Sequence, residues 1–375
     1  MRTIDIDKGP IRYPGAMDWD RSEHGISPRR LPAWTRPQVP EVADPVIRMP
    51  SGVRLEFATD SASIELDVLT TRFEIAGLTY PPMTFDLLVD AQVARIGGTL
   101  RLDLEKPGEF ELLEGPPTTI RFAGLPHAVK RCEIWLPGNG FVELRSLRVD
   151  DGAEFAATER RNQRRWVHHG SSINHCAEAT SPTRTWPVVA ARRAGVDVLN
   201  LGLGGNCQLD PYVARTMRDT RADMLSLKVG INIVNAASLG DRTFGPALHG
   251  FLDTVREGHP DTPFLILSPI ICPCHENTPG PTVYGGNGRF TSITGHEEIR
   301  VGSLTLSRIR QIVSAVIAQR RDDGDSNLHY LDGLELFGED AADLPDDLHP
   351  SGDGYVRMGE RFYEKVFTGT GAFAV

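Results

Sequence analysis

The stretch Trp166-Val167-His168-His169-Gly170-Ser171-Ser172-Ile173-Asn174 joins a short apolar run to a turn that contains glycine and serine. A run of this length is typical of a buried strand, and the turn leads into the next element. Similar apolar runs recur downstream and alternate with helical segments over about 200 residues. This alternation predicts a parallel sheet covered on both faces by helices.

The predicted elements of this region follow one another in a regular order. Strands are expected at residues 166–169, 196–201, 224–229, 264–268 and 328–331. Helices are expected at residues 183–194, 212–220, 246–257, 302–321 and 352–366. Ligands of such open sheets bind at the carboxyl ends of the strands, so functional residues should follow directly after a strand.

Before residue 150 the hydrophobic pattern has a period of two. Alternating runs at 53–57, 63–68, 85–89, 100–104 and 141–147 are separated by Gly and Pro clusters, with no convincing helical stripe between them. The pattern indicates two antiparallel sheets packed face to face, a jelly-roll-like β-sandwich similar to carbohydrate-binding modules. We therefore expect a sandwich domain over residues 1–157 and an α/β domain over residues 158–375.

The composition excludes several classes of protein. The apolar share of 40% and the charged share of 24% are those of a globular chain. The net charge of −10, without a long basic run, argues against nucleic acid as a partner. The first 14 residues lack the apolar core of a signal peptide, and no window is long enough to span a bilayer, so we expect a cytoplasmic protein with no membrane partner. Five cysteines indicate no disulfide framework.

Four candidate sites for chemistry follow strands. Ser172, or its neighbour Ser171, lies in the first turn, although a serine there also caps helices. Gly205 follows the second strand, where backbone amides can approach a substrate closely or simply make a tight turn. Asn232 follows the third strand and offers a neutral donor for an oxyanion, or a helix cap.

The fourth candidate is an Asp-x-x-His pattern before the last predicted helix. Asp346 lies three residues before His349, close enough to bind its Nδ1 and to leave Nε2 free to accept a serine's proton. The combination of a serine, two donor positions and this pair, each at the mouth of a strand, favours nucleophilic catalysis.

The ordered blocks Gly170-Ser171-Ser172, Gly205, Gly230-Ile231-Asn232 and Asp346 to His349 resemble those of the SGNH or GDSL hydrolase superfamily over about residues 165–368. Ser171 stands where that family usually has the aspartate of Gly-Asp-Ser. The resemblance implies a flavodoxin-like domain in which Ser172 is the nucleophile, His349 the base and Asp346 its partner, with Ser171 as the fallback nucleophile.

The same resemblance implies an oxyanion hole made by the amides of Ser172 and Gly205 and the side chain of Asn232. Asp346 matches the family pattern better than Asp347 does. The reaction would pass through an acyl-enzyme on Ser172.

The sandwich combined with this domain is similar to GDSL-type acyltransferases that attach an aromatic acyl group, such as salicylyl, to a tetracycline-type polyketide. We therefore expect acyl transfer from a thioester donor, such as an acyl-coenzyme A co-substrate, to an alcohol on a small-molecule acceptor, with no bound cofactor. Carboxylester hydrolysis is the alternative. A glycan-binding protein with a vestigial catalytic domain is the third.

Other polar clusters are expected to have structural roles. His168 and His169 point to opposite faces of their strand and cannot chelate one ion together. Cys272-Pro273-Cys274-His275 lacks a second pair of ligands, so no metal is expected. Residues 275–301 show no periodicity, and we expect an unstructured insertion that shapes the substrate pocket. Arg289 and Arg300 within it could meet an anionic donor.

Overall fold

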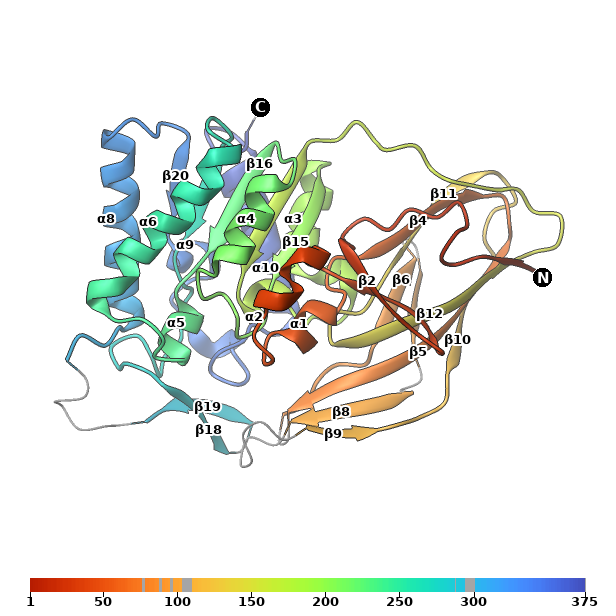
Figure 1. Ribbon diagram of the computed structural model, residues 1–375, viewed down its shortest axis with the longest axis horizontal. Helices are drawn as coiled ribbons and strands as arrows, with labels where there is room; N and C mark the ends of the chain where they lie inside the picture. Colours follow the sequence, from red (N-terminus) through yellow and green to blue (C-terminus); the bar gives the residue numbers. More distant parts are fainter. Residues whose placement is uncertain are drawn as a thin grey trace. The chain divides into compact units, whose positions relative to one another are not determined.

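The computed structural model in Figure 1 describes residues 1–75, 78–87, 90–94, 97–102, 110–286, 288–293 and 301–374. The chain forms two compact units. The first contains Met1–Asn162 together with Cys176–Arg184, and the second contains Gln163–His175 together with Thr185–Val375. We expected a single boundary between residues 157 and 158, whereas this division also places Cys176–Arg184 in the first unit.

Asp86, a buried residue of strand β6, holds Cys176–Arg184 in the first unit. Its Oδ2 accepts hydrogen bonds from Ser181 Oγ at 2.6 Å and from the Thr183 backbone N–H at 2.9 Å. These partners lie 95 and 97 residues away along the chain, so no local pattern could reveal the contact.

The first unit is a β-sandwich of two sheets. The larger sheet contains β1 (Arg2–Ile4), β2 (Asp18–Ser22), β3 (Gly25–Arg29), β5 (Ser63–Ile75), β8 (Gly98–Leu102), β9 (Phe110–Leu113), β10 (Thr118–Ala123) and β12 (Gly140–Val149). The second contains β4 (Arg54–Thr59), β6 (Thr84–Leu87), β7 (Asp90–Val93), β11 (Lys130–Trp135) and β13 (Phe155–Ala156). Alternate residues of β5 are buried, and the core draws on both sheets. The predicted sandwich is confirmed.

Two details of the sandwich differ from expectation. β5 and β8 pair in parallel, because the chain crosses to the second sheet for β6 and β7 and returns in the same direction. Two short helical segments also interrupt the strands, the 3-10 helix η1 (Ala33–Gln38) and α1 (Asp44–Arg48). Prolines lie in both, and neither is long enough to produce a periodic stripe.

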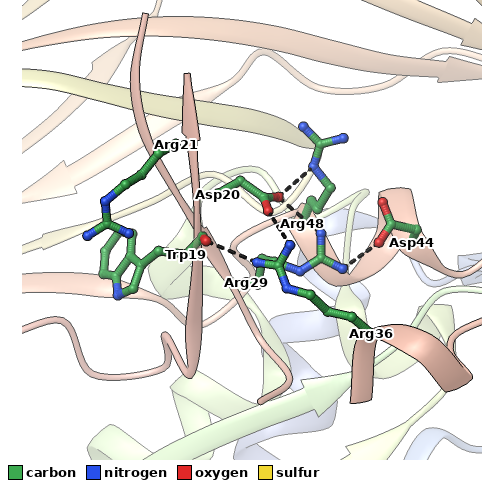
Figure 2. Close-up of a pocket in the computed structure, with 7 residues that line it drawn as sticks. All are labelled: Trp19, Asp20, Arg21, Arg29, Arg36, Asp44 and Arg48. Atoms are coloured by element: carbon green, nitrogen blue, oxygen red, sulfur yellow. Dashed lines mark hydrogen bonds and ion pairs between the residues drawn. The ribbon is translucent and has the colours of Figure 1, made fainter. Parts of the chain in front are cut away.

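Charged side chains join these helical segments to β2 and β3 (Figure 2). Asp20 pairs with Arg29 at 3.0 Å, Arg36 at 2.9 Å and Arg48 at 3.2 Å. Arg29 also pairs with Asp44. The cluster lines an open hollow of about 580 Å³. A network of several ion pairs holds its members more firmly than an isolated surface pair does, so we assign it to anchoring η1 and α1.

The second unit is built on a five-stranded parallel sheet. Its strands are β14 (Arg165–Gly170), β15 (Asp197–Gly202), β16 (Met224–Lys228), β17 (Phe264–Leu267) and β20 (Leu328–Leu331). Their order is β15-β14-β16-β17-β20, which is the flavodoxin-like order, and all pairings in it are parallel. The predicted fold class is confirmed, and all five predicted strands lie within two residues of the observed ones.

Helices cover both faces of this sheet (Figure 1). The helical elements described in the second unit are α2 (Ser172–His175), α3 (Trp186–Ala194), α4 (Pro211–Asp219), α5 (Ile231–Asn235), α6 (Asp241–Gly258), α8 (Leu306–Asp322), α9 (Gly333–Phe337), the 3-10 helix η3 (Ala341–Asp343), α10 (Gly352–Phe362) and η4 (Tyr363–Phe367). The 3-10 helix η2 (Pro182–Arg184) belongs to the first unit. α4, α6 and α8 pack in series, as do α3, α10 and α9. α3 begins at Trp186, later than predicted, because Pro187 lies in its first turn, where proline is favoured.

Strand β14 shows how the sheet separates its two faces. Trp166 stacks on Phe362 of α10, with ring centroids 5.0 Å apart. His169 instead stacks on Phe251 of α6, with centroids 6.1 Å apart. Trp166 and His169 are both fully buried, so β14 is covered on both of its faces.

The insertion after β17 is not wholly irregular. β18 (Thr282–Gly286) and β19 (Arg289–Ser292) form an antiparallel hairpin, and the expectation of an unstructured stretch is wrong for these residues. Residues 294–300, which include Arg300, lie outside the described part of the chain. No helix among the described residues is both long and apolar enough to cross a membrane.

Candidate active site

The turn after β14 presents one serine and buries the other. Ser171 is fully buried, and its backbone N–H donates to Asn174 Oδ1 at 3.1 Å. Ser172 begins α2 and is partly exposed. Gly170 is required here because a Cβ at that position would lie 2.3–2.6 Å from the Asn174 side chain. The glycine therefore lets the turn close over Asn174.

The Asn174 side chain contacts a buried histidine, His168. Its Nδ2 lies 2.5 Å from His168 Nε2, and His168 Nδ1 lies 2.6 Å from Ser226 Oγ. Burial lowers the pKa of His168 well below its ordinary value, so the imidazole is neutral and accepts at Nε2. The expected structural role of His168 agrees with this network.

Ser172, His349 and Asp346 form a continuous chain of hydrogen bonds. His349 Nε2 lies 2.8 Å from Ser172 Oγ, and His349 Nδ1 lies 2.6 Å from Asp346 Oδ2. Because a carboxylate only accepts, the Nδ1 of a neutral imidazole carries the proton and Nε2 presents its lone pair to the serine. That tautomer can remove a proton from the Ser172 hydroxyl.

The turn that carries Asp346 and His349 also fixes the aspartate as an anion. Asp346 Oδ1 accepts from the backbone N–H of Leu348 at 3.0 Å and of His349 at 2.6 Å. Burial raises the pKa of Asp346, but the hydrogen bonds and charge of His349 and these two N–H groups outweigh it, so the pKa lies below the ordinary value.

The neighbouring aspartate has another partner. The Asp347 carboxylate pairs with Arg289 of β19 at 3.1 Å, and its backbone adopts a φ of +66°. The geometry thus brings Ser172 and Asp346 to His349, while Ser171 and Asp347 are bound elsewhere.

Gly205 and Asn232 follow the two strands that flank β14. Asn232 is buried, and its Oδ1 accepts from the backbone N–H of Cys207 at 3.0 Å. Because Oδ1 is occupied in this way, Nδ2 is the end of the amide that can donate to a substrate oxygen. Gly205 is exposed with a φ of +72°, and space is open around its Cα.

Gln208 links these two positions and was not found from the sequence. Its Nε2 donates to the Asn232 carbonyl at 3.0 Å and to the Gly205 carbonyl at 3.4 Å. A glutamine in a polar loop carries no sequence signal that separates it from a surface residue.

The β18–β19 hairpin contacts the turn that carries Asp346 and His349, which we call the catalytic turn. The Phe290 backbone N–H donates to the Asp346 carbonyl at 3.0 Å, and the Phe290 ring packs edge-on against the His349 imidazole, with centroids 5.9 Å apart. Thr282 at the other strand donates to Asn235 of α5 at 2.9 Å. Phe290 is therefore an aromatic neighbour of His349, and no pattern in the sequence pointed to it.

The sequence matches a protein-family model, and the structure matches several solved structures. A family model described as GDSL-like lipase/acylhydrolase matches residues 163–272, which include Ser172, Gly205 and Asn232. The chain is thus similar to the SGNH/GDSL superfamily over residues 163–272. It is therefore an enzyme of acyl transfer or ester hydrolysis. No match is found among the curated proteins.

Several solved structures are similar to this protein over nearly the whole chain. The salicylyl-acyltransferase SsfX3 from a tetracycline biosynthetic pathway has a TM-score of 0.78 at 27% identity, covering 96% of this chain and 95% of that one. A putative GDSL-like lipase from Bacteroides ovatus has a TM-score of 0.65 at 18% identity, covering 94% and 96%. A family two carbohydrate esterase from Clostridium thermocellum has a TM-score of 0.60 at 14% identity, covering 94% and 96%.

Among the described residues, no group of three or more His, Cys, Asp or Glu side chains is arranged to hold an ion. Cys272 and Cys274 lie close together, but His275 uses Nδ1 toward the Thr278 carbonyl and Nε2 toward Thr282 Oγ1.

We predict that Asn232→Ala reduces kcat about a hundredfold or more, since a preorganised oxyanion donor contributes about 3 kcal/mol to the barrier. Asn327→Ala, the same change just before the amino end of β20, should leave the rate unchanged and serves as the matched control. Steady-state turnover of p-nitrophenyl esters measures both, with circular dichroism to confirm folding. Equal rates in wild type and Asn232→Ala would contradict the assignment of Asn232 to the oxyanion hole.

A second prediction concerns acid stability. The lowered folded-state pKa of Asp346 means that its carboxylate stabilises the fold above the unfolded-state pKa of about 4, and that this contribution is lost as the pH falls through the folded-state pKa. The free energy of unfolding of wild type should exceed that of Asp346→Asn by an amount that shrinks as the pH falls below about 4. Urea unfolding at several pH values measures this difference, and a difference that does not change over that range would contradict the assignment.

Proposed function

We propose that the protein is a serine acyltransferase that moves an acyl group from a thioester donor, through an acyl-enzyme on Ser172, to a hydroxyl of a small polyketide-type acceptor. The observation that carries this proposal is the hydrogen-bonded chain from Asp346 through His349 to Ser172. A serine hydroxyl is a weak nucleophile by itself and needs such a base within hydrogen-bond reach.

In the first half-reaction, Ser172 Oγ attacks the donor carbonyl while its proton moves to His349 Nε2. The oxygen of the tetrahedral intermediate is met by the Asn232 Nδ2 donor and by the backbone N–H groups of Ser172 and Gly205. The carbon–sulfur bond then breaks, and His349 returns the proton to the leaving thiolate. The products are a free thiol and the ester of Ser172.

In the second half-reaction, the acceptor hydroxyl takes the place of the serine. His349 Nε2 removes its proton as the oxygen attacks the acyl-enzyme carbonyl, and the same proton goes to Ser172 Oγ as the ester bond to the serine breaks. Asp346 keeps the imidazole in one tautomer and stabilises its positive charge in both steps. Water in the same position would give hydrolysis, so the outcome depends on which hydroxyl the site admits.

Two findings support transfer to a small-molecule acceptor. The similarity to the salicylyl-acyltransferase extends over both units at 27% sequence identity. The GDSL-like lipase and the carbohydrate esterase described above are only 18% and 14% identical to this chain. The ring of Phe290 also places an aromatic surface beside the base. Such a surface suits a planar acyl group or a polycyclic acceptor, because aromatic pairs gain energy beyond the area they bury.

Hydrolysis of a carboxylic ester is the second candidate function. The family model that matches residues 163–272 is described as a lipase/acylhydrolase, and the chain of hydrogen bonds at Ser172 serves both reactions. A glycan binder without catalysis is disfavoured, since such a protein would not need the complete set of Ser172, His349 and Asp346.

Intact-protein mass spectrometry separates transfer from hydrolysis. The enzyme is mixed with acyl thioesters, including salicylyl-coenzyme A and acetyl-coenzyme A, with and without polycyclic alcohols as acceptors. We expect an acyl adduct on wild type that an alcohol discharges faster than water does, and no adduct on Ser172→Ala.

Rapid conversion to free acid, independent of any alcohol, would establish an esterase instead. Ser171→Ala is the matched control, because it removes the neighbouring hydroxyl and should still form the adduct. An adduct that persists in Ser172→Ala would overturn the proposed nucleophile.

A further inference from the structure

Two thiols lie together in the loop that follows β17. Cys272 Sγ and Cys274 Sγ are 3.6 Å apart. Cys272 is 1% exposed, whereas Cys274 is only partly buried. The buried thiol is thus paired with one that a small reagent can reach.

Cys272 also contacts the turn that carries the base. Cys272 Sγ lies 3.4 Å from the Asp347 backbone carbonyl oxygen, to which its S–H donates, and 3.6 Å from Cys274 Sγ, to which the same proton can turn. Asp347 lies between Asp346 and His349 in sequence and holds a left-handed φ of +66°, which a non-glycine residue adopts only with support from its surroundings. Cys272 supplies one of those supports, so it is a positioning residue for the catalytic turn.

The surroundings favour a thiolate at Cys274. Its pKa is lowered to about 5, first by the hydrogen bond from Cys272 and, against the effect of burial, by the neighbouring His275. The pKa of Cys272 is raised, because its proton is shared with Cys274 and because it is buried. Cys274 is therefore the more easily ionised of the two thiols.

The backbone around Cys272 is clamped. The Cys272 N–H donates to Glu276 Oε1 at 3.0 Å, and Arg310 binds the Glu276 carboxylate with two nitrogens at 2.6 and 2.9 Å. Arg310 also donates to the Pro269 carbonyl at 3.1 Å. A change in the distance between the two sulfurs must then be taken up by Cys274 and by the Cys272 side chain.

We propose that Cys272 and Cys274 are a peroxide-sensitive thiol pair whose closure to a disulfide withdraws the Cys272 hydrogen bond from the catalytic turn and slows the enzyme. The Cys274 thiolate attacks hydrogen peroxide, so that a sulfur–oxygen bond forms, the oxygen–oxygen bond breaks and hydroxide leaves. The Cys272 sulfur then attacks the sulfenic acid, and water leaves with the Cys272 proton as the disulfide forms. Overall, two thiols are oxidised and one peroxide is reduced to two waters.

Closure changes the local geometry in a defined way. The two sulfurs approach from 3.6 Å to the bonded distance of about 2.05 Å. The S–H donor to the Asp347 carbonyl no longer exists in the disulfide. Loss of one hydrogen bond of this kind predicts a fall in kcat of about two- to tenfold, with KM unchanged. A thiol reductant such as dithiothreitol restores both thiols.

The chemistry is tested on the full-length protein without reference to its activity. Hydrogen peroxide is added in increasing amounts, remaining thiols are alkylated, and the peptide with residues 272–274 is mapped by mass spectrometry. We expect it to lose two hydrogens and to resist alkylation before the peptides of Cys132, Cys176 and Cys207 react. Alkylation of both Cys272 and Cys274 after the other cysteines have oxidised would overturn the proposal.

The effect on catalysis is tested with matched variants on a p-nitrophenyl ester. Cys274→Ser should keep the untreated rate of wild type and lose its sensitivity to peroxide. Cys272→Ala should be slow without peroxide, like the oxidised wild type, and Cys272→Ser should rescue it, because a hydroxyl can donate to the Asp347 carbonyl. Equal inhibition of wild type and Cys274→Ser by peroxide would place the sensitive group elsewhere.

Discussion

The side chain of Asn174 is the constraint on which the catalytic arrangement depends. Its Oδ1 accepts a hydrogen bond from the Ser171 backbone N–H, and its Nδ2 contacts His168. The backbone carbonyl of the same residue accepts from Asn200 Nδ2 at 2.9 Å. These bonds join the nucleophile turn to β14 and to β15 beside it. A serine can attack only if its Oγ stays in one position relative to the base, and the buried, hydrogen-bonded side-chain amide of Asn174 holds the turn in place.

The same network explains why polar residues are tolerated in a strand buried on both faces. His168 and Trp166 both hydrogen-bond to Ser226 Oγ, at 2.6 and 2.7 Å, so their ring nitrogens are satisfied within the sheet. Buried polar groups that are fully paired fix one arrangement of the core, whereas unpaired ones would destabilise it. In this enzyme the pairing reaches from the middle of the sheet to the turn that carries Ser172.

Much of this could be predicted from local sequence. Each parallel strand is a short apolar run. Ser172, Gly205 and Asn232 each follow a predicted strand closely, and His349 lies just before the last predicted helix. The fold class and the similarity to the SGNH/GDSL superfamily could therefore be predicted. Ser172 could be preferred to Ser171 only by resemblance, because exposure at that turn is decided by Asn174 and not by the serines themselves.

What could not be predicted depends on contacts between distant parts of the chain. The transfer of Cys176–Arg184 to the first unit depends on Asp86, and the position of Cys272 beside the catalytic turn spans 75 residues. The β18–β19 hairpin carries no clear hydrophobic alternation, since its strands are short and none of their described residues is fully buried. Gln208 and Phe290 have no motif, because each acts through a backbone group or a ring contact.

The central claim is that His349 activates Ser172 and not its neighbour. It is tested most directly by reaction with a p-nitrophenyl alkylphosphonate, which forms a stable adduct with an activated serine, followed by peptide mapping. The account predicts one adduct, on Ser172, which forms far more slowly in His349→Ala. An adduct on Ser171, or equally fast labelling of Ser172 in His349→Ala, would contradict it.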